Sequence, residues 1–90
     1  MKFIKLGKST LCVSHLAYGC WRIARTWDSS RVTPQARASG VQSLITAHEA
    51  GFTFYDLADI YCDNVAEEIF GQALRKVKGL QRNAIIATKC

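Results

Sequence analysis

The sequence lacks the features of a membrane-spanning, metal-binding or disulfide-stabilised protein. Its four cysteines form no C-x-x-C pair and are too sparse for a disulfide framework, so reduced thiols in a cytoplasmic protein are expected. His15 and Cys20 lie far from other potential ligands, so no zinc site is expected. No segment approaches the roughly 20 apolar residues of a membrane span, and the first residues lack the apolar region of a signal peptide. Neither export nor membrane insertion is therefore expected.

Acidic side chains are also scarce at the start of the chain, where Asp28 is the sole acid among the first 32 residues. Such a basic segment could attract an anionic ligand, but hairpin lysines also serve as a solvated edge that resists aggregation. The basic residues are not interleaved with a stacking platform or placed on a recognition helix, so nucleic acid is not an expected partner. These basic residues are Lys2, Lys5, Lys8, Arg22, Arg25 and Arg31, and the net charge of the whole chain is +5.

The chain does contain short apolar segments that alternate with segments of helical periodicity. Residues 3–6 and 11–13 flank a glycine-containing turn and predict a β-hairpin. Short buried strands are predicted at 16–18, 52–56 and 85–89, with one helix between each pair. This order predicts right-handed βαβ units and a parallel sheet, which is an α/β fold. Because a closed parallel barrel needs about 250 residues, the 90 residues are interpreted as the front part of a longer chain, cut after its third barrel strand.

The first helix has clear signals at both ends. Thr33 is the predicted N-cap, Pro34 occupies the first helical position, and Gly51 marks the C-terminal stop. His48 is interpreted as a partly buried residue of the apolar stripe near the end of the helix, not as a catalytic group. The stripe consists of Val41, Leu44, Ile45 and His48.

The second helix is predicted to begin at Asn64 and to end at Gly79. Glu67 follows Asn64 at the spacing of a capping box. Its predicted core residues are Ile69, Phe70, Ala73, Leu74 and Val77.

Three polar side chains are expected to meet where the predicted strands end. Asp56 closes one strand and Lys89 closes the next, so two parallel neighbours about 4.8 Å apart would bring them side by side. Tyr61 follows in the loop just beyond that edge. The carboxyl edge of a parallel sheet is where α/β folds carry their chemistry, so these residues predict an acid–base site.

The loop after the first predicted strand supplies further candidates. Gly19 is either a point where a cofactor approaches the backbone or a simple turn at the strand end. Trp21 and Trp27 bracket the loop from Arg22 to Val32. They would either wall a substrate pocket or anchor this loop to the core.

Taken together, these motifs resemble the N-terminal part of an aldo-keto reductase, a (β/α)8 barrel enzyme that depends on NADPH. The resemblance implies that residues 1–90 belong to one barrel domain, with a hairpin closing the barrel floor, three parallel strands and two helices. The match covers nearly the whole chain. It is carried by residues 5–9 with Val13-Ser14, by Gly19-Cys20-Trp21, by Ala50-Gly51-Phe52, by Asp56-x-Ala58-x-x-Tyr61 and by Thr88-Lys89.

The resemblance implies a role for each matched site residue. Tyr61 would be the general acid that protonates a carbonyl oxygen of an aldehyde or ketone while hydride arrives from NADPH. Lys89 would lower the pKa of this phenol from its reference value of about 10, and Asp56 would hold Lys89 in place. Gly19, Cys20 and Trp21 would contact the nicotinamide and the substrate, and Asp56 would also belong to the cofactor-binding residues.

Two departures from the family pattern bear on function. Cys62 follows the tyrosine where glycine is usual, and the active-site histidine and most cofactor-binding residues of the family lie outside the matched part. Two alternatives therefore stay open: a non-catalytic, reductase-like regulatory or partner-binding subunit, and a truncated product without function. The sequence does not indicate an oligomeric state.

Overall fold

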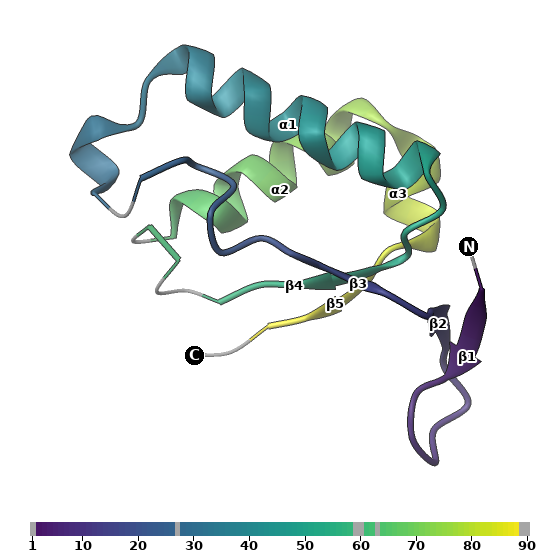
Figure 1. The fold of residues 1–90 in the computed structure, drawn as a ribbon. Helices are drawn as coiled ribbons and strands as arrows, with labels where there is room; N and C mark the ends of the chain where they lie inside the picture. The colour runs from purple at the N-terminus through teal and green to yellow at the C-terminus, as the bar shows by residue number, and fades with distance from the viewer. Residues whose placement is uncertain (1, 27, 59–60, 63, 89–90) are drawn as a thin grey trace.

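A three-stranded parallel sheet lies at the centre of the fold, with the long helices on one of its faces (Figure 1). The computed structural model describes residues 2–26, 28–58, 61–62 and 64–88. The sheet has the order β3 (Ala17–Gly19), β4 (Phe54–Asp56) and β5 (Ile85–Ala87), and its register places Asp56 beside both Gly19 and Ala87. The carboxyl ends of the three strands are therefore aligned. The predicted parallel sheet is confirmed.

The predicted hairpin is present as β1 (Phe3–Lys5) and β2 (Cys12–Ser14), which pair antiparallel. Gly7 adopts a left-handed backbone conformation in the turn, with φ of +57°, and the Leu6 N–H donates to the Leu11 carbonyl at 2.9 Å. The hairpin lies at the amino end of the parallel strands, opposite the loops that follow β3 and β4 (Figure 1).

Ser14 fastens this hairpin to the sheet. Its hydroxyl accepts hydrogen bonds from the backbone N–H groups of Thr53 and Phe54, at 3.0 and 3.2 Å, and donates to the Leu16 carbonyl at 2.7 Å. The Thr53 hydroxyl in turn accepts from the Ser14 N–H at 2.9 Å. Ser14 is only 1% exposed, so its polar atoms are satisfied almost entirely by these bonds.

Helix α1 (Pro34–Glu49) has the ends predicted from the sequence. The Thr33 hydroxyl accepts from the Ala36 N–H at 3.0 Å, and Pro34 opens the helix. At the other end Gly51 has φ of +102°, and the N–H groups of Gly51 and Phe52 donate back to the last turn. This is a Schellman motif, in which glycine tolerates the left-handed conformation that a side chain would disfavour.

The prediction of a single second helix from Asn64 to Gly79 is wrong. The structure has α2 (Val65–Lys76) and a separate short helix α3 (Lys78–Asn83), because Val77 adopts an extended conformation between them. Gly79 lies inside α3 and does not end a helix. A methyl group on Gly79 would come within 3.2 Å of His48 Nε2, so the glycine allows α3 to approach α1 closely.

The predicted capping box at the start of α2 is also wrong. Asn64 adopts a left-handed conformation, with φ of +72°, and its side chain makes no capping hydrogen bond. An N-cap side chain reaches the first turn from an extended backbone, which Asn64 does not have. The Glu67 carboxylate accepts a hydrogen bond from the Thr88 hydroxyl at 3.2 Å.

The core lies between the sheet and the helices. Tyr55 is fully buried there, with its ring 5.1 Å from that of Phe70 in α2, and its hydroxyl donates to the Phe52 carbonyl at 3.0 Å. Of the predicted stripe residues, five are buried and four are half-buried. The buried ones are Val41, Leu44, Ile69, Phe70 and Ala73, and the half-buried ones are Ile45, His48, Leu74 and Val77.

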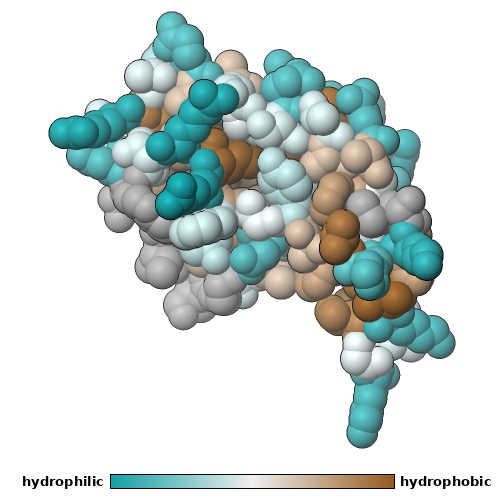
Figure 2. All heavy atoms as spheres, viewed as in Figure 1, coloured by the Kyte–Doolittle hydropathy of each residue, from teal (hydrophilic) through white to brown (hydrophobic). Residues whose placement is uncertain are grey.

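The burial predicted for residues 16–18 is wrong. Leu16 is 53% exposed, Ala17 is exposed and Tyr18 is half-buried. Within the described part of the chain, helices cover only one face of the sheet, so apolar side chains elsewhere stay open to solvent. Hydrophobic surface gathers where the hairpin meets the sheet (Figure 2). The other large exposed apolar side chains are Phe3, Ile4, Leu6, Leu11, Trp21 and Ile86.

The loop between β3 and α1 is anchored by two buried apolar side chains. Ile23 and Ala24 are buried in the core, and a methyl group on Gly40 of α1 would come within 2.9 Å of the Ile23 carbonyl oxygen. The loop ends in a 3-10 turn, η1 (Ser29–Arg31), in which the Ser30 N–H donates to the Asp28 carboxylate at 3.0 Å. Gly40 therefore lets the loop pack directly on the helix.

Candidate active site

The structure brings Asp56 and Tyr61 together at the carboxyl end of β4. The Tyr61 hydroxyl donates a hydrogen bond to Asp56 Oδ2 at 3.2 Å, and both side chains are half-buried. Asp56 lies on the opposite face of the strand from Tyr55, which packs against the helices. The carboxylate and the phenol are therefore on the side of the sheet that no described helix covers.

The turn after β4 positions the phenol. The Tyr61 N–H donates to the Ala58 carbonyl at 3.3 Å, and the Tyr61 carbonyl accepts from the Ala66 N–H at the start of α2. Cys62 has φ of +51°, a left-handed conformation that suits the glycine usual at this position in the resembled family. The cysteine adopts that conformation here with its side chain buried.

Lys89 lies outside the described residues, so its predicted pairing with Asp56 stays a prediction. The described part of β5 ends at Ala87, which pairs with Asp56, and the Leu57 N–H donates to the Ala87 carbonyl at 2.8 Å. The end of β5 therefore lies directly beside the end of β4.

Gly19 and Cys20 lie on the side of Asp56 that faces β3, opposite to β5. Gly19 is the register partner of Asp56, and the Cys20 N–H donates to the Asp56 carbonyl at 3.0 Å. Burial, and secondarily the negative charge of Asp56, raise the pKa of the Cys20 thiol to about 12. The thiol is therefore protonated at neutral pH and serves packing, so only the backbone at this position is suited to contact a ligand.

Trp21 is 48% exposed at the start of the loop that follows β3. The guanidinium carbon of Arg22 lies 4.9 Å from the centre of its ring, which is a cation–π contact. The indole is thus half exposed, whereas Ile23 and Ala24 in the same loop are buried in the core. Trp27, the other predicted pocket residue, lies outside the described residues.

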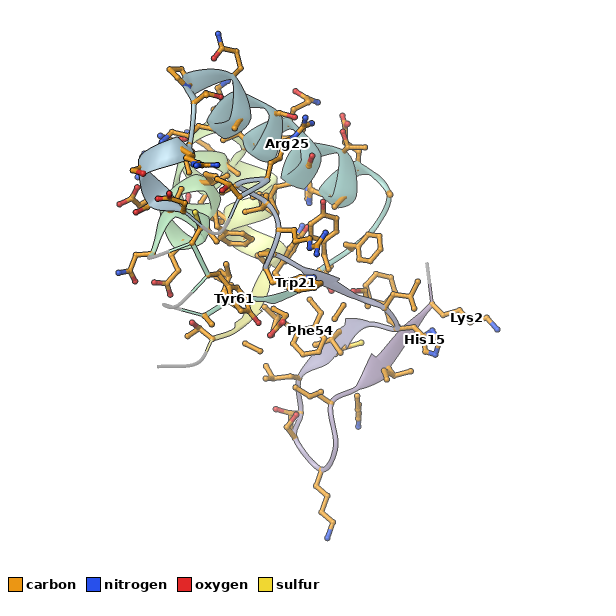
Figure 3. The ribbon with its side chains drawn as sticks, turned by 60° about the vertical axis from the view of Figure 1, so that its left-hand side comes forward. Lys2, His15, Trp21, Arg25, Phe54 and Tyr61 are labelled. Carbon is orange, nitrogen blue, oxygen red and sulfur yellow. The ribbon has the colours of Figure 1, made fainter. Side chains whose placement is uncertain are left out.

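Figure 3 shows Trp21, Phe54 and Tyr61 in one region of the molecule, while Lys2 and His15 lie with the hairpin. Of the predicted site residues that the structure describes, Gly19, Cys20, Asp56 and Tyr61 lie together at the carboxyl ends of β3 and β4. Among residues 2–26, 28–58, 61–62 and 64–88, no group of three His, Cys, Asp or Glu side chains could hold a metal ion. No helix in the same ranges is both long and apolar enough to cross a bilayer.

Two features of the structure were not predicted. Ser14 joins the hairpin to the amino end of β4, and the signal for it was the Val13-Ser14 pair, whose polar side chain follows an apolar strand. A small cavity of about 180 Å³ also opens beside Trp21 and is lined by Arg22, Arg25 and Thr26. A roomier hollow of about 530 Å³ lies between α1 and α2, on the helical layer and away from Asp56.

Comparison with known proteins places the chain in a family. The model of the aldo/keto reductase family matches residues 15–90. The chain is 35% identical over 99% of its length to a probable voltage-gated potassium channel subunit beta of Oryza sativa subsp. japonica, of which it covers 25%. It is 36% identical over 87% of its length to the 6-dehydroglucose reductase of Agrobacterium fabrum, of which it covers 24%.

Solved structures give the same result. The chain superimposes on the aldo-keto reductase AKR11C1 from Bacillus halodurans with a TM-score of 0.76 and 31% identity, covering all of this chain and 26% of that one. The chain also superimposes on the thermostable aldo-keto reductase Tm1743 with a TM-score of 0.81 and 24% identity. This superposition covers 98% of this chain and 30% of that one, and it shows a similar fold.

The fold is thus that of the N-terminal part of a (β/α)8 reductase barrel. The chain belongs to the aldo/keto reductase family. It spans about a quarter of the length of the curated relatives it matches.

Proposed function

We propose that the whole protein is an NADPH-dependent oxidoreductase that reduces aldehydes or ketones to alcohols. The observation that carries the proposal is the hydrogen bond from the Tyr61 hydroxyl to the Asp56 carboxylate at the carboxyl end of the sheet. Family membership supports it, since a reductase of this family needs a proton donor at that edge. Residues 1–90 form, in this proposal, the first part of a single barrel domain.

The described residues fit a nicotinamide cofactor. Gly19 has no side chain and is exposed, and the exposed indole of Trp21 stands two residues further on, so a flat ring can approach the backbone after β3. NADPH, when bound, supplies the hydride. Gly19, Cys20 and Trp21 would form one wall of its nicotinamide site, with Asp56 beside them.

Tyr61 would hold the proton that the carbonyl oxygen receives. Its hydroxyl is held by Asp56 in the observed arrangement, so the phenol is oriented before a substrate enters. Lys89 would stabilise the phenolate left after proton transfer, and Asp56 would position the Lys89 ammonium. Trp21 and Trp27 would exclude water from the carbonyl.

A second candidate function is a regulatory or partner-binding subunit without catalytic activity. The observation that favours it is the 35% identity to a rice protein named a probable voltage-gated potassium channel subunit beta, with a similar match of 34% in Arabidopsis thaliana. Fold alone does not separate the two functions. The presence of Asp56, Tyr61 and Lys89 together in the sequence supports the enzyme.

The test is carbonyl-dependent oxidation of NADPH by the purified whole protein, followed at 340 nm with a panel of aldehydes and ketones. Turnover that requires both the carbonyl and NADPH supports the reductase. Tight binding of NADPH without turnover of any carbonyl would contradict it and support the regulatory subunit. A cytoplasmic location is part of the proposal and fits the free thiols of Cys12, Cys20 and Cys62.

A further inference from the structure

The small cavity beside Trp21 combines an aromatic wall with two positive charges. It has a volume of about 180 Å³ and is lined by Trp21, Arg22, Arg25 and Thr26. It begins two residues beyond the end of β3, and the intervening Cys20 is hydrogen-bonded through its backbone to Asp56. The cavity therefore shares Trp21 with the proposed nicotinamide site.

Arg22 and Arg25 lie in a loop segment that is anchored in the core. Ile23 and Ala24, which lie between them, are 8% and 1% exposed and belong to the core, whereas Arg22 and Arg25 are exposed. Arg25 has φ of +68°, and its N–H donates to the Arg22 carbonyl at 2.9 Å, so a tight turn brings the two residues together. The turn therefore holds both guanidinium groups on the solvent side of an anchored loop.

Neither arginine is neutralised within the described part of the chain. The ion pairs there are Arg31–Asp28 and Arg37–Glu68. Arg22 lies over the indole of Trp21, and Arg25 donates to the Ser39 hydroxyl at 2.7 Å, so both partners are uncharged. Two guanidinium groups around one cavity without a described carboxylate favour a negatively charged ligand.

We propose that this cavity binds the carboxylate of the substrate, so that the preferred substrates are carbonyl compounds that carry a carboxylate. A guanidinium binds a carboxylate through paired N–H groups, while the indole packs on the apolar carbons between carboxylate and carbonyl. With a volume of about 180 Å³, the cavity has room for a carboxylate and a few carbons. This inference rests on the proposed reductase function and adds the class of its substrate.

The test compares 4-carboxybenzaldehyde with its methyl ester as substrates of the whole protein, at saturating NADPH. The expected ratio of kcat/KM for the acid to kcat/KM for the ester is well above one. Arg22→Gln and Arg25→Gln are each expected to lower this ratio by up to about fivefold, since each removes one exposed charge pair, and the double variant should lower it further. Arg22→Lys should give an intermediate ratio, because it keeps the charge but loses the paired N–H groups.

The matched control is Arg82→Gln, which removes the same charge from an exposed position in α3. It is expected to leave the ratio unchanged. A second readout independent of turnover is the NMR shift of the Trp21 indole N–H during titration with benzoate. This shift should appear in the unchanged protein and be lost in the double variant.

Several results would overturn the inference while leaving the reductase intact. One is a ratio near one that neither arginine substitution moves. Another is a rise in the KM for NADPH in the arginine variants with an unchanged ratio, which would assign the arginines to the phosphates of the cofactor. If no carbonyl is reduced at all, the proposed function fails, and the benzoate titration alone then decides whether the cavity binds a carboxylate.

Discussion

The hydroxyl of Tyr61 and the carboxylate of Asp56 lie 3.2 Å apart, joined by a hydrogen bond across the end of one strand. If Tyr61 supplies the proton during reduction, Tyr61→Phe removes that proton and keeps the ring. We expect the kcat for carbonyl reduction to fall by a factor of about 10² to 10⁴ and the affinity for NADPH to change little. Steady-state kinetics and a fluorescence titration with NADPH measure the two effects.

Tyr18→Phe is the matched control for this experiment. Tyr18 belongs to β3, and its ring packs edge-to-face on Phe52, a contact that phenylalanine retains. Its turnover is expected to stay close to that of the unchanged protein. Near-normal turnover in Tyr61→Phe would remove Tyr61 from the role of proton donor.

Gly40 should be far less tolerant of a side chain than Gly71. A methyl group at position 40 would meet the Ile23 carbonyl oxygen at 2.9 Å and Ile69 Cγ2 at 3.0 Å, both in the core. We expect Gly40→Ala to lower the free energy of unfolding by about 1–3 kcal/mol through overpacking. Urea unfolding measures this change.

Gly71→Ala provides the comparison within the same fold. Position 71 lies in the interior of α2, where the nearest atom to an added methyl group is the end of the Arg75 side chain at 3.7 Å. We expect this substitution to raise the free energy of unfolding by about 0.5–1 kcal/mol, because alanine is the better helix former. Equal effects at the two positions would contradict the close packing of the loop on α1.

Ser14→Ala should loosen the hairpin from the sheet. The substitution leaves the N–H groups of Thr53 and Phe54 without the hydroxyl that they now share, at a partly buried site. We expect a loss of about 1–3 kcal/mol in the free energy of unfolding. Thermal and urea unfolding measure the loss, and amide hydrogen exchange at Thr53 and Phe54 should accelerate.

Ser9→Ala is the corresponding change at an exposed site. The Ser9 hydroxyl donates to the Leu6 carbonyl at 2.6 Å in the hairpin turn, where water can replace it. Its expected effect lies within about 0.5 kcal/mol. If Ser9→Ala proved as damaging as Ser14→Ala, burial would not be the reason for the importance of Ser14.

Stability should fall at alkaline pH because two buried acids resist ionisation. Burial raises the pKa of Cys20 from 9.0 to about 12, and burial likewise raises the pKa of Tyr55 from 10.0 to about 12. The folded protein therefore retains protons that the unfolded chain loses between pH 9 and 12. The free energy of unfolding should decrease across this window by up to about 1.4 kcal/mol per pH unit for each group.

Unfolding by urea at a series of pH values measures this dependence. In Cys20→Ala the decline should be shallower between pH 9 and 12, because one of the two groups is gone. A pH dependence in that window that is the same with and without Cys20 would contradict the assignment.

Local signals in the sequence were enough to predict α1 and the hairpin. Thr33, Pro34 and Gly51 act through hydrogen bonds and backbone conformations within a few residues of themselves, so their effect does not depend on the rest of the fold. The strand positions followed from short apolar runs. Their order and parallel arrangement followed from the helices between them.

The start of α2 and the α2–α3 break depended on contacts between distant segments. Glu67, the predicted capping-box partner of Asn64, is instead hydrogen-bonded to Thr88, 21 residues away. Gly79 faces His48 on another helix. Prediction from local sequence signals alone therefore gave the wrong helix boundaries.

The sequence by itself determined the family, the alternation of strands and helices, and the positions of the acid and the phenol relative to the end of one strand, because these follow from spacing and local propensity. Only the tertiary structure decided which distant segments meet. It seated Ser14 between the hairpin and β4, and it packed Ile23 against Gly40 beside the loop in which Arg22 and Arg25 share a cavity. The physical reason is that such contacts join segments far apart in the chain, and their geometry is set by how the sheet and helices pack.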